Sequence, residues 1–238
     1  MGLRIWVVIV ALIVLANGCA LLRSGGSGEK APKETPRLLA LKGAESMKKK
    51  DYDDALEAFK RLKERYPYSK YALLADLNIG DAYFHKKEYD AAVSAYEEFA
   101  RLHPRNEAIP YVFYQIGMCH FLSFKSIDRD LEGTYKAIDS FNRLLRSYPN
   151  SSYATKARLR LSECKKRLAA HELYAARIYY KMGKCRAALL TLEALRKNYP
   201  QAARELGYNE KIRRLSEACR VCVEKGSSKP SLWSRLGF

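Results

Sequence analysis

Six cysteines are the residues of this chain best able to do chemistry, and Cys19 has the most informative surroundings. It follows Arg4, an uninterrupted run of twelve apolar residues from Ile5 to Ala16, and the small residue Gly18. The run is too short for a membrane span of roughly 20 residues and is typical of a signal-peptide core. We therefore expect a signal peptide over residues 1–18, cleaved so that Cys19 becomes the first residue.

A cysteine at this point resembles the lipobox of bacterial lipoproteins, in which the new N-terminal cysteine is acylated. The match is incomplete, because Ala16 stands where leucine is usual and Leu15 lies one place further out. Ala20 follows the cysteine, whereas an aspartate there marks inner-membrane retention in such lipoproteins. The resemblance implies a lipid anchor at Cys19 on the periplasmic face of the outer membrane. Ordinary secretion and an uncleaved anchor are the alternatives.

The other five cysteines form no recognisable redox or metal motif. Cys219 and Cys222 make a C-x-x-C in a helix-patterned stretch, whereas a redox motif needs a helix N-terminus to lower the thiol pKa. A zinc site would need a second such pair or paired histidines, and the sequence has neither. Because their number is odd, at least one thiol stays free. The five are Cys119, Cys164, Cys185, Cys219 and Cys222.

The histidines also stand apart, and the sequence has neither an H-E-x-x-H nor a G-x-S-x-G pattern. Cys119 and His120 are adjacent, so on a helix their side chains point in different directions and cannot form a local base–nucleophile pair. No nucleophile, base and oxyanion donor come together. We therefore predict a binding protein rather than an enzyme, with no metal and no cofactor. The histidines are His85, His103, His120 and His171.

The formal net charge of +17 is compatible with nucleic acid, anionic lipid or acidic protein partners. A periplasmic address argues against nucleic acid. Two explanations of the positive charge remain. One is a solvated helix surface rich in lysine and arginine, and the other is attraction to lipid headgroups beneath the anchor. Residues 19–36 are rich in Gly, Ser, Lys and Pro and carry no apolar period, so we expect a lipidated, flexible tether. As a random coil it would span roughly 20–25 Å.

From Arg37 onward the sequence repeats itself. Four segments share an alanine twelve residues before a proline and a large side chain four residues after the alanine. A small residue where a second helix crosses, with a large one on the same face, is typical of paired helices, and proline ends the second helix. The alanines are Ala55, Ala92, Ala137 and Ala188; the prolines are Pro67, Pro104, Pro149 and Pro200; the large residues are Phe59, Tyr96, Phe141 and Leu192.

Gly43 and Gly80 lie twelve residues before the first two alanines, which matches the tetratricopeptide repeat of about 34 residues. Consecutive prolines are 37, 45 and 51 residues apart, so the units are unequal. If Gly117 belongs to the third unit, eight extra residues enter around Ser126–Asp130. Residues 153–181 contain no glycine or proline, which predicts one long helix linking the third and fourth units.

The predicted fold is therefore all-α: a tetratricopeptide-type solenoid of helical hairpins, with about five helix pairs. We expect N-terminal repeats over residues 37–149 and C-terminal repeats over residues 150–225. A final helix over about Glu205 to Glu224 would cap the array, and residues 226–238 would form a loose tail.

Two segments, Tyr66–Tyr71 and Tyr148–Tyr153, have the form Y-P-x-S-x-Y. Together with the polar segment Asp128–Asp130, the long helix and the lipid cysteine, they make the chain from about Leu38 to Val223 resemble the BamD family, the lipoproteins of the β-barrel assembly machinery. The Y-P-x-S-x-Y form also occurs in the Tol–Pal-associated periplasmic protein. A periplasmic tetratricopeptide adaptor of the Tol–Pal, cell-envelope type is therefore the alternative.

The resemblance implies partners rather than an active site. Family members bind a POTRA domain of the Omp85-type barrel subunit through their C-terminal half, and other assembly lipoproteins are expected partners. Their N-terminal repeats are implicated in receiving unfolded outer-membrane proteins, whose C-terminal strands typically end in an aromatic residue. An arginine that relatives use in the POTRA contact falls at Thr191 in this chain, so that contact is not carried over.

The repeat register also predicts a groove for the substrate peptide. The first helix of each tetratricopeptide pair lines the concave face, and counting from the repeat alanines and Gly117 places a set of mostly aromatic and methionine side chains there. Such a lining suits an extended apolar segment with aromatic side chains. The alternative is that several of these residues are inter-helix core. The predicted groove residues are Met47, Lys48, Phe84, His85, Tyr111, Tyr114, Met118 and Phe121.

Overall fold

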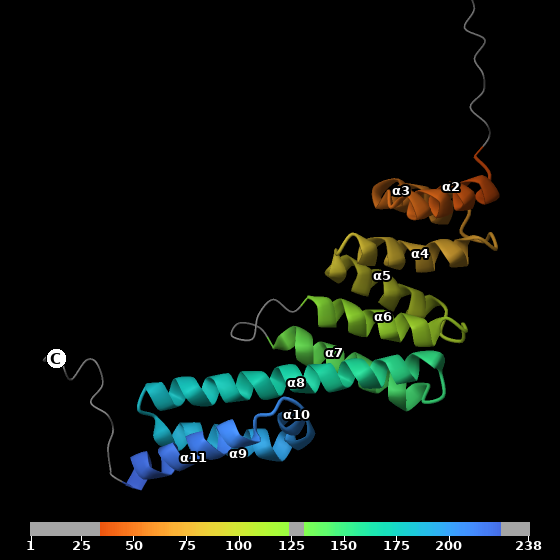
Figure 1. Cartoon of the computed structure of the whole chain (residues 1–238). Coiled ribbons are helices and arrows are strands. Elements are labelled where there is room, and N and C mark those ends of the chain that lie inside the picture. Colours follow the sequence, from red (N-terminus) through yellow and green to blue (C-terminus); the bar gives the residue numbers. More distant parts are fainter. Residues whose placement is uncertain (1–33, 124–130, 225–238) are drawn as a thin grey trace, which may run out of the picture.

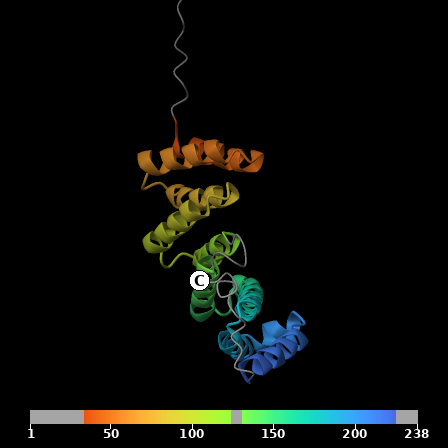
Figure 2. The same cartoon turned by 90° about the vertical axis from the view of Figure 1, so that its left-hand side faces the viewer.

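The computed structural model describes residues 34–123 and 131–224, and all regular structure in these two ranges is α-helical. Successive helices pack as antiparallel pairs that stack into an elongated array (Figure 1), and the pairs rotate relative to one another along it (Figure 2). The predicted all-α solenoid is therefore confirmed. The helices are α2 (Pro36–Lys49), α3 (Tyr52–Arg65), α4 (Ala72–His85), α5 (Tyr89–Leu102), α6 (Ile109–Leu122), α7 (Glu132–Ser147), α8 (Ser152–Lys181), α9 (Cys185–Asn198), α10 (Pro200–Glu205) and α11 (Asn209–Glu224).

Several sequence predictions concern residues outside these ranges. They are the signal peptide at residues 1–18, Cys19 and most of the tether, the polar segment Ser126–Asp130, and the tail at residues 226–238. Among the described helices, none combines the length and the apolar character that crossing a membrane requires.

Close approach of the paired helices follows from the repeated small residues. The four repeat alanines are fully buried. A Cβ atom added to the glycine of each of the first three units would lie only 2.4–2.6 Å from the ring of that unit's large residue, so the ring occupies the space that a side chain would need. Gly117 is thereby confirmed as the glycine of the third unit. The pairs are Gly43 with Phe59, Gly80 with Tyr96, and Gly117 with Phe141.

The turns also repeat. The second helices of the first three units are followed by the C-cap residues Tyr66, His103 and Tyr148, each directly before a proline and each with a φ angle between −139° and −127°. Proline disfavours helical geometry in the residue before it, which explains these ends. Inside the hairpins, Lys50, Lys87 and Gly183 have φ angles of 63°, 64° and 76° at the same position, five residues before the repeat alanine.

The long helix predicted between the third and fourth units is confirmed as α8, which has 30 residues. Its first half contributes Ala157 and Cys164 to the core beneath α5, α6 and α7. Its second half contributes Leu173 and Ala176 to the core formed with α9, α10 and α11. One continuous helix therefore belongs to both cores and holds the two halves of the array together (Figure 1).

The final helix predicted over about Glu205 to Glu224 is confirmed as α11, which starts at Asn209 rather than Glu205, and a short helix that was not predicted, α10, precedes it. Pro200 begins α10, where its fixed φ angle and missing N–H group suit the first helical position. Gly207 then takes the left-handed conformation, with φ of 65°, and ends α10 before α11 starts at Asn209. At the other end, α2 starts at Pro36 rather than Arg37, with the Thr35 hydroxyl accepting a hydrogen bond from the Leu38 N–H group.

A disulfide between Cys185 and Cys222 joins the start of α9 to the last turn of α11. Cys222 therefore does not pair with Cys219 of the same C-x-x-C. Cys119, Cys164 and Cys219 are free and buried. Burial raises the pKa of the Cys119 thiol to about 12 and that of Cys164 to about 11, so both stay protonated at neutral pH.

Candidate peptide-binding surfaces

The predicted groove residues lie on α2, α4 and α6, the first helices of the first three pairs. Lys48 and His85 are exposed, and Phe121 is buried with 6% of its surface accessible. At the repeat position that Met47, Phe84 and Phe121 share, the side chain is partly buried in the first two units and buried in the third. The partly buried members are Met47, Phe84, Tyr111, Tyr114 and Met118.

The third unit is less open because α8 covers it. The Tyr153 ring lies 5.5 Å from the Tyr111 ring and 5.6 Å from the Tyr114 ring, measured between centroids. The Arg167 guanidinium lies 3.6 Å from the centroid of the Phe121 ring, and its Nη1 donates to the Phe121 carbonyl at 2.7 Å. Phe121 therefore packs against α8, and Tyr111 and Tyr114 form a half-covered wall.

Three exposed leucines on the same helices escaped the sequence prediction. Leu41, Leu74 and Leu122 are 57%, 44% and 40% exposed. The signal was present, since Leu74 has the repeat position of Tyr111, and Leu122 has that of Lys48 and His85. We call the exposed set Leu41, Lys48, Leu74, His85 and Leu122 the front face. Three of its five residues are leucines, and four of the five lie on the first two units.

Asp81 of α4 lies beside this face in a network of buried hydroxyl groups. The hydroxyls of Tyr96 and Tyr111 each donate to Asp81 Oδ1 at 2.5 Å, and Gln115 Nε2 donates to the Tyr111 hydroxyl at 3.0 Å. Burial raises the pKa of Asp81 above its ordinary value, although the two hydrogen bonds oppose this. The carboxylate also raises the pKa of both tyrosines, after burial itself. The network fixes α5 and α6 against α4.

Replacing Asp81 with asparagine should change how stability depends on pH. A carboxyl with a raised folded-state pKa favours folding when protonated, so its contribution falls as pH rises through that pKa. Asparagine keeps an oxygen acceptor but does not titrate. The stability of Asp81→Asn relative to wild type should therefore increase from strongly acid pH towards neutrality. Urea denaturation across that range measures the difference in the free energy of unfolding. For the control Glu107→Gln, at an exposed site, the free energy of unfolding should follow the same pH dependence as that of wild type.

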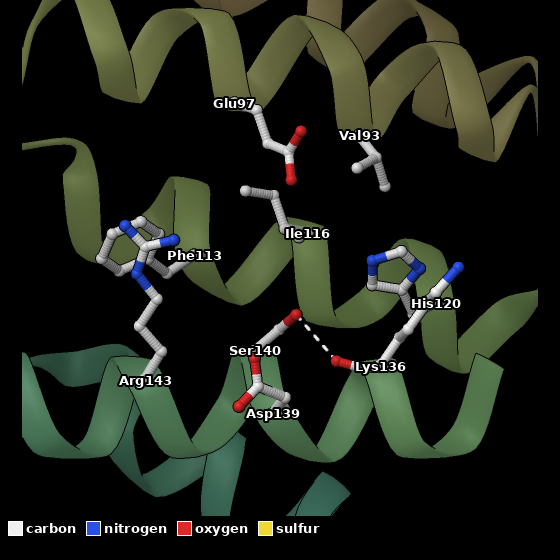
Figure 3. A pocket seen from close by; sticks show the side chains of 9 residues that line it. All are labelled: Val93, Glu97, Phe113, Ile116, His120, Lys136, Asp139, Ser140 and Arg143. Carbon is white, nitrogen blue, oxygen red and sulfur yellow. Dashed lines mark hydrogen bonds between the residues drawn. The ribbon is translucent and has the colours of Figure 1, made fainter. Parts of the chain in front are cut away.

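A different surface, on the side of the second helices, holds a hollow between α5, α6 and α7 (Figure 3). Its floor is apolar, with Phe113 and Ile116 of α6 pointing into it, and Glu97 points in from α5. One part has a volume of about 370 Å³ and the other about 540 Å³, and they share Glu97, Phe113, Ile116 and Arg143. We call the joined hollow the second-junction cavity.

The described charges are distributed unevenly along the array. Residues 34–123 contain 14 lysines and arginines and 14 aspartates and glutamates, whereas residues 152–224 contain 17 and 7. We call residues 152–224 the rear. Arg177, Arg186 and Arg196 are exposed there, and the ion pairs within this part of the chain involve other cations, such as Lys166 and Arg213. The rear is therefore a basic surface, while the part that bears the front face is neutral.

Residues 33–218 match the family model of YfiO, described as an outer membrane lipoprotein. A Caulobacter vibrioides relative named "Outer membrane protein assembly factor BamD" is 30% identical over 195 residues, which cover 79% of this chain and 62% of the relative. The Vibrio cholerae relative of the same name is 29% identical, with 80% and 82% covered, and that of Xylella fastidiosa (strain Temecula1) is 31% identical, with 82% and 69% covered.

Among solved structures, the "TPR2AB-domain:pHSP90-complex of yeast Sti1" aligns with a TM-score of 0.48 and 19% identity, covering 79% of this chain and 70% of the other. The assignment of the fold rests on the repeat register and the helix pairs described above. The match to the family model spans most of the chain and all but the last few described residues. The chain belongs to the YfiO family of outer-membrane lipoproteins, and its relatives from Caulobacter, Vibrio and Xylella are named as outer membrane protein assembly factors.

Proposed function

We propose that this chain is a lipid-anchored scaffold of the β-barrel assembly machinery on the periplasmic face of the outer membrane. In this proposal the front face receives unfolded outer-membrane proteins, and the rear binds a POTRA domain of the Omp85-type barrel subunit. Other assembly lipoproteins are further partners. The role is binding rather than catalysis, and Cys19 carries the anchor. The names of the relatives support the general role in assembly.

The observation that carries the proposal is the division of the array into two unlike surfaces. The front face is apolar and open on a charge-balanced part of the chain, as a receptor for extended apolar segments requires. The rear has an excess of ten positive charges, which complements an acidic protein partner and accelerates its association. Because α8 belongs to both cores, a protein on the front face is held at a fixed distance from one on the rear.

The front face is tested with a double variant that leaves the core intact. Leu41→Ser with Leu74→Ser removes two exposed apolar side chains, so binding of a peptide taken from a C-terminal outer-membrane strand should weaken about tenfold. Fluorescence anisotropy with a labelled peptide measures the dissociation constant. Phe84 and Tyr114 are less suitable positions for such substitutions, because both side chains also pack inside the protein. Phe84 packs against the Tyr89 ring, and Tyr114 packs against the Phe141 and Tyr153 rings.

The matched control is Leu159→Ser, which removes an exposed leucine from α8 in the rear and should leave peptide affinity unchanged. Equal affinity of wild type and the Leu41 and Leu74 variant, with both folded by circular dichroism, would exclude the front face as the receiving surface.

A further inference from the structure

Three cysteines lie together where α11 packs along α9 at the end of the array (Figure 1). Cys185 and Cys219 belong with Ala188 to one buried cluster, and Cys222, which is partly exposed, packs against it. Cys185 and Cys222 form the disulfide, with their Cα atoms 6.1 Å apart. The third thiol, that of Cys219, is free and fully buried. A free thiol beside a disulfide is the arrangement that thiol–disulfide exchange requires.

The register of α11 brings Cys219 close to Cys222. The two residues are three apart on the helix, so their side chains share a face with Cβ atoms about 5–6 Å apart. A disulfide brings its Cβ atoms to roughly 4 Å, so the helix has to tighten there by about 1–2 Å. Cys222 lies in the last turn of α11, where few backbone hydrogen bonds have to change. Cys185 and Cys219 are therefore rival partners for one sulfur atom.

Cys185 is placed to leave as a thiolate when its disulfide is attacked. It is the first residue of α9, and the N-cap residue Lys184 makes no side-chain hydrogen bond to the free N–H groups of the first turn. That turn contains no acidic residue, and the exposed Lys184 and Arg186 flank the cysteine. The positive end of the helix and the two cations stabilise a thiolate at Cys185. The C-x-x-C itself ends a helix, so the helix N-terminus that a redox motif needs is supplied by α9.

We propose that Cys185, Cys219 and Cys222 form a thiol–disulfide exchange site with two disulfide states, interconverted by an incoming thiol. The incoming thiolate attacks Cys222 Sγ, the bond to Cys185 breaks, and its electron pair leaves on Cys185 Sγ. Cys219 Sγ then attacks the same Cys222 Sγ and expels the incoming thiolate unchanged. The disulfide has moved to Cys219 and Cys222 without an oxidant or a reductant. Cys219 releases one proton to solvent, which balances the negative charge left on Cys185.

The order of these steps follows from burial. Burial raises the pKa of the Cys219 thiol, so this thiol is a poor nucleophile while the first disulfide is intact. Once the bond to Cys185 breaks, α11 is held at the end of the solenoid by packing alone, and its last turn frays and admits water. In the second state no covalent bond joins α11 to α9. The site therefore loosens or fastens the end of the rear.

The test uses the folded chain and 2-mercaptoethanol, an uncharged thiol, at about pH 8, where part of a free thiol is ionised. Acid quenching followed by peptide mapping locates every disulfide and adduct. Wild type should acquire a bond between Cys219 and Cys222 and a free Cys185. In Cys219→Ala the adduct on Cys222 should accumulate about tenfold more than in wild type, because an intramolecular thiol outcompetes one in solution. Cys164→Ala, which removes a buried free thiol of another core, should behave as wild type.

Wild type alone decides the inference if Cys219→Ala does not fold. Absence of a bond between Cys219 and Cys222 in thiol-treated, folded wild type would overturn it, as would a bond between Cys185 and Cys219 in its place. With both proteins folded, equal amounts of the Cys222 adduct in wild type and Cys219→Ala would do the same. These measurements read disulfides only, so their outcome is independent of the proposed function.

A charge reversal at the start of α9 tests the leaving group. Lys184→Glu with Arg186→Glu should slow formation of the Cys222 adduct about threefold, because the thiolate left on Cys185 is less stabilised. Arg196→Glu with Lys197→Glu makes the same change in net charge at exposed positions in the last turn of α9 and should leave the rate unchanged. Equal rates in the two variants would contradict departure of Cys185 from the N-terminus of α9.

Discussion

Replacing Phe141 with alanine is expected to lower the free energy of unfolding by about 3–5 kcal/mol, the usual loss for a phenylalanine in a closed core. The Phe141 ring is fully buried. Its edge occupies the space above Gly117, and the Tyr114 ring lies 6.0 Å away between centroids. Since Gly117 has no side chain to fill the space, α6 and α7 cannot close the cavity. The third unit, which joins the front of the array to α8, should lose most of its stability.

Urea denaturation followed by circular dichroism measures this loss, with Tyr68→Ala as the matched control. Tyr68 is fully exposed, so its removal should change the free energy of unfolding by less than about 0.5 kcal/mol. The glycine provides a second check. Gly117→Ala should destabilise wild type, because its Cβ would lie 2.4 Å from the Phe141 ring, but should be tolerated in the Phe141→Ala background. A Phe141→Ala variant as stable as Tyr68→Ala would contradict the described packing of α6 and α7.

Removing the Cys185–Cys222 disulfide should produce the other large loss, about 4 kcal/mol if the bond acts by constraining the unfolded chain across 37 residues. The last unit of a solenoid has a neighbour on one side only, so its end lacks the support that internal units share. The double variant Cys185→Ala with Cys222→Ala should therefore lose protection of amide hydrogens in α9, α10 and α11 before those of α2 to α6.

Hydrogen exchange read by mass spectrometry locates this effect, and a reductant supplies the control. Dithiothreitol should lower the Tm of wild type but leave that of the double variant unchanged, because the variant has no bond left to reduce. If the reductant does not affect wild type, Cys185 and Cys222 are not joined in the protein, and the stability of the last unit has another source.

The arrangement of the helices could be predicted because the repeat leaves small residues where helices cross. The register of Ala137 and Phe141 alone identified Gly117 as their partner across an insertion, and the structure places the Phe141 ring over that glycine. The absence of glycine and proline between residues 153 and 181 was sufficient to predict α8.

Other features depend on contacts between segments far apart in the sequence, and these were not predictable. Nothing in the spacing of Cys185, Cys219 and Cys222 indicates which two would meet, since the pairing is decided by how α11 lies on α9. Burial of Phe121 results from Arg167 of α8, 46 residues further along the chain. The break at Gly207 could have been found, because a glycine before an asparagine-initiated helix is a common stop signal.

The candidate surfaces, too, could be predicted from the sequence only in part. The repeat register placed aromatic and methionine residues on α2, α4 and α6 as a peptide groove, and this role stays a prediction. The sequence did not show that α8 covers the third unit of that side. The second-junction cavity was not predicted at all. Arg101 and Arg143 line it from α5 and α7 and lie 42 residues apart in the sequence, so no local pattern brings them together.

The central claim, that the rear docks this protein onto the barrel assembly subunit, is tested most directly by copurification from solubilised outer membrane. A tagged wild-type chain should recover an Omp85-type barrel protein. Arg196→Glu with Lys197→Glu, two exposed positions of the rear, should lose it, whereas Lys42→Glu with Arg105→Glu, outside the rear, should retain it. Recovery of Tol components without any Omp85-type protein would contradict the account and indicate an envelope adaptor instead.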